Sequence, residues 1–122
     1  MKKNFLKLIL LSLILTIVFS SCEKEKVCGV DNPQKDLPWL KEFIDVVGSN
    51  AQAGFSHHVK IYQCTYRNGI GFLIEPCVGC PDAGFLLVNC EGKCLCNLWG
   101  FTGDSCTEYN IDFKRKKLIW KN

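Results

Sequence analysis

Residues 57–75, HHVKIYQCTYRNGIGFLIE, carry the local signal that decides the fold. From His58 onward β-favouring residues alternate with polar ones, a period of two that is typical of a strand with one buried face. Asn68-Gly69 follows, and a type I′ turn favours this pair because both of its central residues take positive φ. IGFLIE then reads as the returning strand. The stretch therefore predicts an antiparallel β-hairpin.

Three further strands are predicted downstream of this hairpin. GFLLVNC (84–90) and CLCNLW (94–99) form a second hairpin around Glu91-Gly92, and Leu118–Trp120 make a last strand whose flanking lysines protect an exposed edge. Since consecutive hairpins pair locally, we expect a meander.

One helix is predicted upstream, in KDLPWLKEFIDVVGSN (35–50). Asp36 suits the N-cap, Pro38 suits the first turn and Gly48 suits the end. The apolar residues fall at helical spacing and predict a stripe that packs on the sheet: Trp39, Leu40, Phe43, Val46 and Val47. The expected fold class is α+β, with one N-terminal helix packed on a small antiparallel sheet of about five strands, rich in disulfides.

The first 21 residues read as a lipoprotein signal peptide. Lys2 and Lys3 form a positive start, and residues 8–19 are apolar except for Ser12 and Thr16. A helix of that length reaches about 18 Å, which is too short for a bilayer core of about 30 Å. The segment is therefore expected to target the chain for export.

Phe19-Ser20-Ser21-Cys22 resembles a bacterial lipobox, in which small residues precede the cut and the cysteine thiol accepts a diacylglyceryl group. We predict lipid attachment at Cys22, a tether over residues 22–35 and one globular domain over 36–122. Glu23 is not the aspartate that resembles an inner-membrane retention signal. The expected location is therefore the outer membrane of a Gram-negative bacterium, facing either the periplasm or the surface, with the lipid bilayer as a partner.

The charge balance argues against nucleic acid as a partner. The chain has 15 basic and 12 acidic residues. Lys2, Lys3 and Lys7 precede Cys22, so the mature chain is formally neutral. A neutral domain lacks the positive field that a nucleic acid requires.

Eight cysteines remain after Cys22, an even number in an oxidising compartment, and they are disulfide candidates: Cys28, Cys64, Cys77, Cys80, Cys90, Cys94, Cys96 and Cys106. Up to four bridges are possible, and the spacing leaves the connectivity open. Cys90 and Cys94 could face each other across a turn, whereas Cys94 and Cys96 are expected to reach different partners. Cys28 either pins the tether to the domain or stays free.

Two chemical alternatives to a structural framework involve Cys77 and Cys80. A C-x-x-C pair can act in thiol redox chemistry, although that motif needs a helix N-terminus and here it lies in a Pro- and Gly-rich loop. The same pair with Cys94 and Cys96 could hold zinc, but the second pair is C-x-C rather than C-x-x-C. We favour structural disulfides and expect no bound metal.

Outside the cysteines, no combination of residues predicts catalysis. His57 and His58 are adjacent, so on a strand they point to opposite faces and suit surface positions better than one metal site. Asp82 suits a turn cap, and Ser56 lacks a third partner for a catalytic triad. We therefore expect a non-enzymatic protein without a cofactor.

Several stretches together resemble a group of small, uncharacterised lipoproteins of Gram-negative anaerobes: DLPWLKEF, IYQCTYRNG, EPCVGCPD, NCEGKCLC, GFTG with Cys106, and KLIWKN. Cys94 and the short GFTGDSC loop depart from that group. The family is a domain of unknown function, so the resemblance implies a single domain and an envelope location but no activity.

The function expected from the sequence is a membrane-anchored domain that binds a protein or glycan ligand or has a structural role. One alternative is an inhibitor or immunity-type lipoprotein that blocks a secreted enzyme through loops 76–84 and 100–105. The other alternative is the thiol redox or zinc protein based on Cys77 and Cys80.

Overall fold

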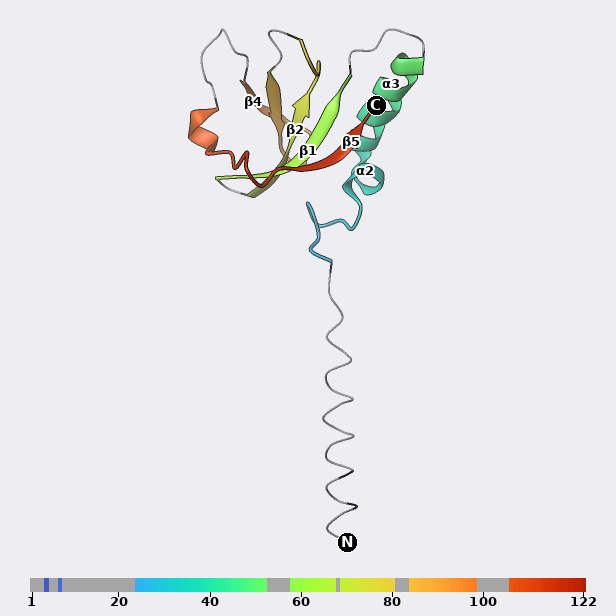
Figure 1. The fold of residues 1–122 in the computed structure, drawn as a ribbon, viewed down its shortest axis with the longest axis vertical. Helices are drawn as coiled ribbons and strands as arrows, with labels where there is room; N and C mark the ends of the chain where they lie inside the picture. The colour runs from blue at the N-terminus through green and yellow to red at the C-terminus, as the bar shows by residue number, and fades with distance from the viewer. Residues whose placement is uncertain are drawn as a thin grey trace.

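The computed structural model describes residues 4, 7, 24–52, 58–67, 69–80, 84–98 and 106–122. The elements of the domain follow the order α2 (Pro33–Asp36), α3 (Pro38–Gln52), β1 (Lys60–Tyr66), β2 (Gly69–Glu75), β3 (Phe85–Val88), β4 (Cys94–Leu98), the short 3-10 helix η1 (Thr107–Tyr109) and β5 (Lys117–Lys121). Figure 1 shows the five strands as one curved sheet with the helices beside it.

The sheet is antiparallel throughout, in the order β4-β3-β2-β1-β5. Tyr66 pairs with Gly69 at the tight end of the first hairpin, which confirms the predicted β1–β2 unit. Asn68 itself lies outside the described residues. The first four strands form the expected meander, but β5 does not continue it: the chain crosses from β4 to the opposite edge and pairs with β1. The expected simple meander is therefore wrong for the last strand.

Helix α3 covers one face of the sheet. Its Leu40 is fully buried, and it packs in a cluster with Ile61 and Phe72, which are also fully buried. The indole ring of Trp39 meets the Phe72 ring edge to face, with 5.5 Å between ring centroids. Such pairs contribute beyond the burial of their area. The predicted stripe therefore holds α3 except at Val46, which is 55% exposed, and Ile44 packs in the cluster instead.

The other face of the sheet has a second buried cluster, made of Cys64, Leu73, Leu87, Cys96 and Cys106. These residues alternate along each strand with those of the first cluster, because successive side chains of a strand point to opposite faces. The segment 106–116, which includes η1, passes over this face on its way from β4 to β5 (Figure 1). The sheet is therefore covered on both faces, by α3 and by this crossing segment.

The expected N-terminal position of the helix is wrong. Helix α3 is short and lies in the middle part of the chain, after α2 and after an isolated bridge between Val27 and Val30. Val27 is buried in the cluster under α3, and the Asp36 carboxylate, expected to cap α3, accepts a hydrogen bond from the Asn32 amide at 2.9 Å. Residues 27–35, expected within the tether, therefore pack on the domain because apolar residues and a disulfide bring them there.

Candidate functional site: the cysteine pairs and an aromatic face

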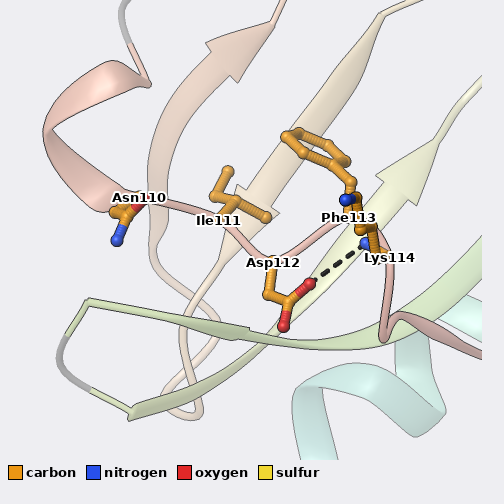
Figure 2. A pocket seen from close by; sticks show the side chains of 5 residues that line it. All are labelled: Asn110, Ile111, Asp112, Phe113 and Lys114. Carbon is orange, nitrogen blue, oxygen red and sulfur yellow. Dashed lines mark hydrogen bonds between the residues drawn. The ribbon is translucent and has the colours of Figure 1, made fainter.

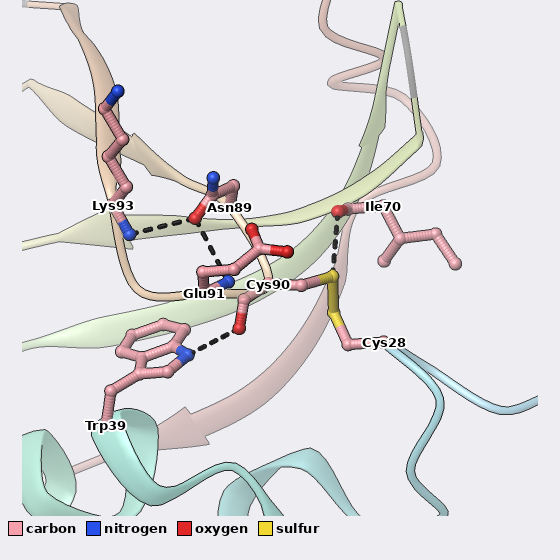
Figure 3. The surroundings of a disulfide bond; sticks show 7 residues. All are labelled: Cys28, Trp39, Ile70, Asn89, Cys90, Glu91 and Lys93. Atoms are coloured by element: carbon pink, nitrogen blue, oxygen red, sulfur yellow. Dashed lines mark hydrogen bonds between the residues drawn. A yellow bond between two sulfur atoms is a disulfide. The ribbon is translucent and has the colours of Figure 1, made fainter.

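The Cys28–Cys90 disulfide joins the start of the domain to the β3–β4 turn, with 5.5 Å between the two Cα atoms (Figure 3). The Trp39 indole donates a hydrogen bond to the Cys90 carbonyl at 2.8 Å. In the same turn, the Asn89 side-chain oxygen accepts hydrogen bonds from the amides of Glu91 and Lys93, at 3.1 and 2.9 Å. The turn is thus pre-shaped by Asn89, and the disulfide and the indole both hold it.

The Cys77–Cys80 disulfide closes a short turn directly after β2. Gly79 adopts a φ of +85°, which glycine takes without strain. The Val78 amide donates to the His58 carbonyl at 2.8 Å, so the turn rests against the start of β1. The two cysteines are half-buried, and no helix begins within the described residues 76–80. The described part of this turn therefore differs from the helix N-terminus that normally activates a C-x-x-C thiolate.

A third disulfide, Cys96–Cys106, links β4 to the start of the crossing segment across a sequence separation of 10. Both cysteines are buried in the second cluster. The proposed facing of Cys90 and Cys94 is wrong, because Cys90 bonds to Cys28 and the exposed Cys94 stays free. Cys94 lies opposite Val88 in the β3–β4 pairing, so it does not face Cys90.

Cys64 is the other free cysteine, and it is only 2% exposed. Burial raises the pKa of its thiol to about 11, against a partly compensating hydrogen bond with the Gly71 backbone. A thiol with so high a pKa is almost entirely protonated near neutrality, and the thiolate is the reactive form. Cys64 therefore serves as a small apolar core residue.

The disulfide pairings remove most of the ligands that the zinc alternative requires. Three of its four proposed ligands, Cys77, Cys80 and Cys96, are in disulfides and carry no thiolate for a metal. Within the described ranges, no group of three or more Cys, His, Asp or Glu residues lies close enough together to hold an ion. His58 is exposed at the start of β1.

The sheet face opposite α3 presents four partly exposed apolar side chains and one lysine, here together named the aromatic face: Tyr62, Phe85, Phe113, Leu118 and Lys116. Ring centroids lie 6.2 Å apart both for Tyr62–Phe85 and for Phe85–Phe113. Leu118 pairs directly with Tyr62 across β1 and β5, so the two side chains share this face. Phe113 is 41% exposed and Leu118 is 43% exposed. The aromatic face thus draws on three strands and on the crossing segment.

A lysine and a carboxylate define the charge on the aromatic face. The Lys116 ammonium lies 5.1 Å from the Tyr62 ring centroid and 5.8 Å from that of Phe85, within the range of cation–π attraction. The Tyr62 hydroxyl donates to the Glu75 carboxylate at 3.3 Å. Burial, followed by the negative charge of Glu75, raises the pKa of Tyr62. Tyr62 therefore remains neutral at physiological pH.

The segment that carries Phe113 is shaped by Asp112 (Figure 2). The Asp112 carboxylate accepts hydrogen bonds from the amides of Lys114 and Arg115, at 3.1 and 3.2 Å, and pairs with the Arg115 side chain at 3.2 Å. Residues 110–114 line an open hollow of about 410 Å³. The Asp112 carboxylate therefore fixes the turn that carries Phe113.

Several residues singled out in the sequence lie outside the described residues: Cys22, Ser56, His57, Asp82 and loop 100–105. Sequence reasoning also missed the aromatic face. Its members come from β1, β3, β5 and the crossing segment, and only the unexpected pairing of β5 with β1 brings them together. The sequence shows a basic run at Lys114–Lys117. The run alone does not indicate that Lys116 lies over two rings.

Within the described part of the chain, no helix is long and apolar enough to cross a membrane. No curated protein and no solved structure matches the chain. Residues 48–122 match a family model described as a domain of unknown function, DUF6970. The match begins inside α3 and includes all five strands, whereas Cys28 and Trp39 precede it. It confirms the uncharacterised-domain part of the sequence resemblance. Because the match covers more than half of the chain, the protein belongs to the DUF6970 family.

Proposed function

We propose that the protein is a membrane-anchored lipoprotein of the cell envelope whose domain binds a protein partner and catalyses no reaction. The anchor is a diacylglyceryl group on Cys22, in the outer membrane of a Gram-negative bacterium, with the domain in the periplasm or at the surface. Support for the anchor comes from the sequence: the positive start, the short apolar segment and the small residues Ser20 and Ser21 before Cys22.

The observation that carries the binding role is the aromatic face. The described residues include three large apolar side chains that are clearly exposed, and two of them, Phe113 and Leu118, lie on this one surface. Clustered exposed apolar groups mark interaction sites, whereas singly exposed ones are ordinary. Val46, on the outer side of α3, is of the single kind. Aromatic residues are also enriched at the centres of protein interfaces.

The charges of the aromatic face suggest the chemistry of the partner. Lys116 forms no ion pair with a carboxylate of the described residues and lies over the rings instead. A partner that places an apolar side chain between Phe113 and Leu118 and a carboxylate near Lys116 would complement this surface. Such a partner would bury the rings, which depends on Phe113, and would give the Lys116 ammonium an ion pair.

The anchor is tested by growing cells that express the full chain with labelled palmitate. We expect the label to appear on the protein and to be lost in Cys22→Ala, while Cys94→Ala, which removes an exposed thiol of the domain, keeps it. An unlabelled, secreted wild-type protein would disprove the anchor.

The binding role is tested by photocrosslinking in the same cells, with a photoreactive residue placed at 113 or, as the matched control, at the isolated exposed position 46. We expect a discrete, protease-sensitive adduct from position 113 alone, which weakens in Lys116→Glu. Equal adducts from both positions, or none, would refute the aromatic face as a binding surface. An adduct that resists protease but yields to glycosidase would assign a glycan ligand instead.

The inhibitor or immunity role is a narrower form of this proposal, in which the partner is a secreted enzyme. It requires a tight complex of one enzyme with one domain and loss of the enzyme's activity on mixing. Loop 76–84 would then contribute contacts, and its Cys77–Cys80 bridge would keep it pre-shaped.

Thiol redox chemistry is the second candidate, favoured by the closed and half-buried Cys77–Cys80 disulfide. In such a reaction a dithiol reductant would be oxidised to a disulfide while Cys77–Cys80 is reduced to two thiols. Mild reduction followed by alkylation tests it: selective labelling of this pair, with the fold intact, supports exchange. Simultaneous reduction of all three bridges excludes it.

A further inference from the structure

The chain between the proposed lipid anchor and the domain is very short. Only residues 23–27 separate Cys22 from Cys28, and Cys28 is bonded to Cys90. Six residue steps reach about 20 Å when fully extended. The disulfide therefore sets which end of the domain can lie next to a bilayer that holds the acyl chains of Cys22. This step rests on the anchor in the proposed function.

The end of the sheet that carries Cys90 can be identified from the topology. Cys90 follows β3, and in the antiparallel sheet the end of β3 lies beside the start of β2, where the Ile70 carbonyl oxygen is 3.4 Å from the Cys90 sulfur (Figure 3). The end of β1 and the start of β5 lie at this same end. Figure 1 shows residues 24–30, the β1–β2 turn and the loop before β5 together at the bottom of the domain.

The crossing segment is fixed to this end by backbone hydrogen bonds. The Arg67 amide donates to the Tyr109 carbonyl at 2.6 Å, and the Asp112 amide donates to the Thr65 carbonyl at 3.0 Å. Lys114 and Arg115 follow immediately and are exposed. The loop is therefore presented at the lower end of the sheet rather than left free to turn elsewhere.

This lower end carries a local excess of positive charge on a formally neutral mature chain. Its exposed basic side chains are Arg67, Lys93, Lys114, Arg115 and Lys117. Lys24 and Lys26 of residues 24–30 add two more. The acidic residues of this end are Glu25, Glu91, Glu108 and Asp112, and the Asp112 carboxylate is engaged with Arg115. Lysine and arginine side chains near an anionic lipid surface are attracted to it within about a Debye length, roughly 8 Å.

We propose that the lower end of the sheet, through Lys114, Arg115 and Arg67, rests against the anionic headgroups of the bilayer that holds the Cys22 anchor. The attraction of a few basic residues is weak by itself. Here the anchor makes the contact intramolecular, so that a high effective concentration replaces intrinsic affinity. The contact orients the domain so that its sheet stands on the bilayer by the lower end. The aromatic face then lies on the side of the domain, open to a partner.

The test uses the full-length protein, extracted from membranes and reconstituted into vesicles of phosphatidylcholine alone or with phosphatidylglycerol. Hydrogen exchange is measured on backbone amides of residues 107–117 and, as an internal reference, of residues 76–80, which follow β2. We expect exchange in 107–117 to be about fivefold slower on the anionic vesicles, a ratio of the size that one or two basic contacts produce. The reference residues should not change.

Two charge-reversed variants provide the matched comparison. Lys114→Glu with Arg115→Glu should remove the slowing, whereas Lys60→Glu with Lys121→Glu, which reverses a facing pair at the opposite end of β1 and β5, should keep it. Equal exchange of the wild type on both vesicles, or loss of slowing in both variants, would overturn the proposed contact.

The intact mass of each sample reports the acyl chains. A missing anchor, which refutes the proposed function, is thereby distinguished from a lipidated protein that does not rest on the membrane.

Discussion

The indole nitrogen of Trp39 lies 2.8 Å from the carbonyl oxygen of Cys90, so the first turn of α3 holds the residue that also carries the disulfide to Cys28. Three segments far apart in the sequence meet at this point: the start of the domain, the helix and the β3–β4 turn. Figure 3 shows the indole below the turn, with its N–H directed at the carbonyl.

Trp39→Phe removes the donor and leaves the part-buried Cys90 carbonyl without it. We expect the free energy of unfolding to fall by about 1–3 kcal/mol, the usual cost of an unsatisfied group together with some lost packing. Denaturant unfolding measures it. An unchanged midpoint would mean that water replaces the indole at no cost.

Gly92→Ala tests the close approach of the same turn to the helix. A methyl group at Gly92 would lie 2.7 Å from the Trp39 ring, and the φ of +84° already disfavours alanine. We expect a loss of about 1–3 kcal/mol in the free energy of unfolding. The matched control is Gly48→Ala inside α3, where the new methyl meets nothing within 4 Å and helix propensity predicts a gain of up to about 1 kcal/mol. Equal effects of the two changes would contradict this geometry.

The disulfides should differ in their contribution to stability. Cys28–Cys90 spans 62 residues of sequence, whereas Cys77–Cys80 spans three. The chain-entropy relation gives about 4 kcal/mol for the long bridge and about 2 kcal/mol for the short one. Thermal unfolding compares the variant in which Cys28 and Cys90 are both serine with the variant in which Cys77 and Cys80 are both serine. A larger loss of stability from the Cys77–Cys80 change would show that the short bridge does more than close its turn.

Native-state alkylation at neutral pH should modify one thiol of the domain, the exposed Cys94. Cys64 should react only after unfolding, because its thiol is buried and protonated. Intact mass before and after adding denaturant counts the labels. Labelling of Cys64 in the native protein would mean that β1 opens readily.

The raised pKa of Cys64 predicts a loss of stability at high pH. Below about pH 9 the thiol is neutral in both the folded and the unfolded chain, so its contribution is fully present. Between the unfolded value of 9.0 and the folded value of about 11, the unfolded chain ionises first and stability falls. The total effect is about 2–3 kcal/mol. Cys64→Val serves as the control, since its unfolding curves should lack this part of the pH dependence.

The sequence predicted the local elements but not the helix ends: α3 continues through Gly48 to Gln52, and Asp36, expected as its N-cap, is the last residue of α2. Asn68-Gly69 indicated the first hairpin, the apolar stripe from Trp39 to Val47 indicated the helix, and the two runs on either side of Glu91-Gly92 indicated the second hairpin. Each of these signals depends on backbone preference or on side-chain periodicity over a few residues. Such preferences act whatever surrounds the segment.

The disulfide partners and the aromatic face were not predictable in the same way. Cys90 has Cys94 nearby in sequence, yet the packing of residues 27–30 against the core brings Cys28 to it instead. Phe113 reaches Phe85 only because the chain crosses the sheet before β5 pairs with β1.

The sequence by itself therefore determined the hairpins, the helix and the even set of cysteines beyond Cys22. Only the tertiary structure decided which cysteines pair, which strand lies at each edge and which face keeps its rings exposed. The physical reason is that a turn or a helical stripe follows from neighbouring residues, whereas a crossing connection depends on burial summed over the whole sheet. Cys64 illustrates the difference: it counted as a disulfide candidate in the sequence, but its burial in the second cluster makes it part of the core.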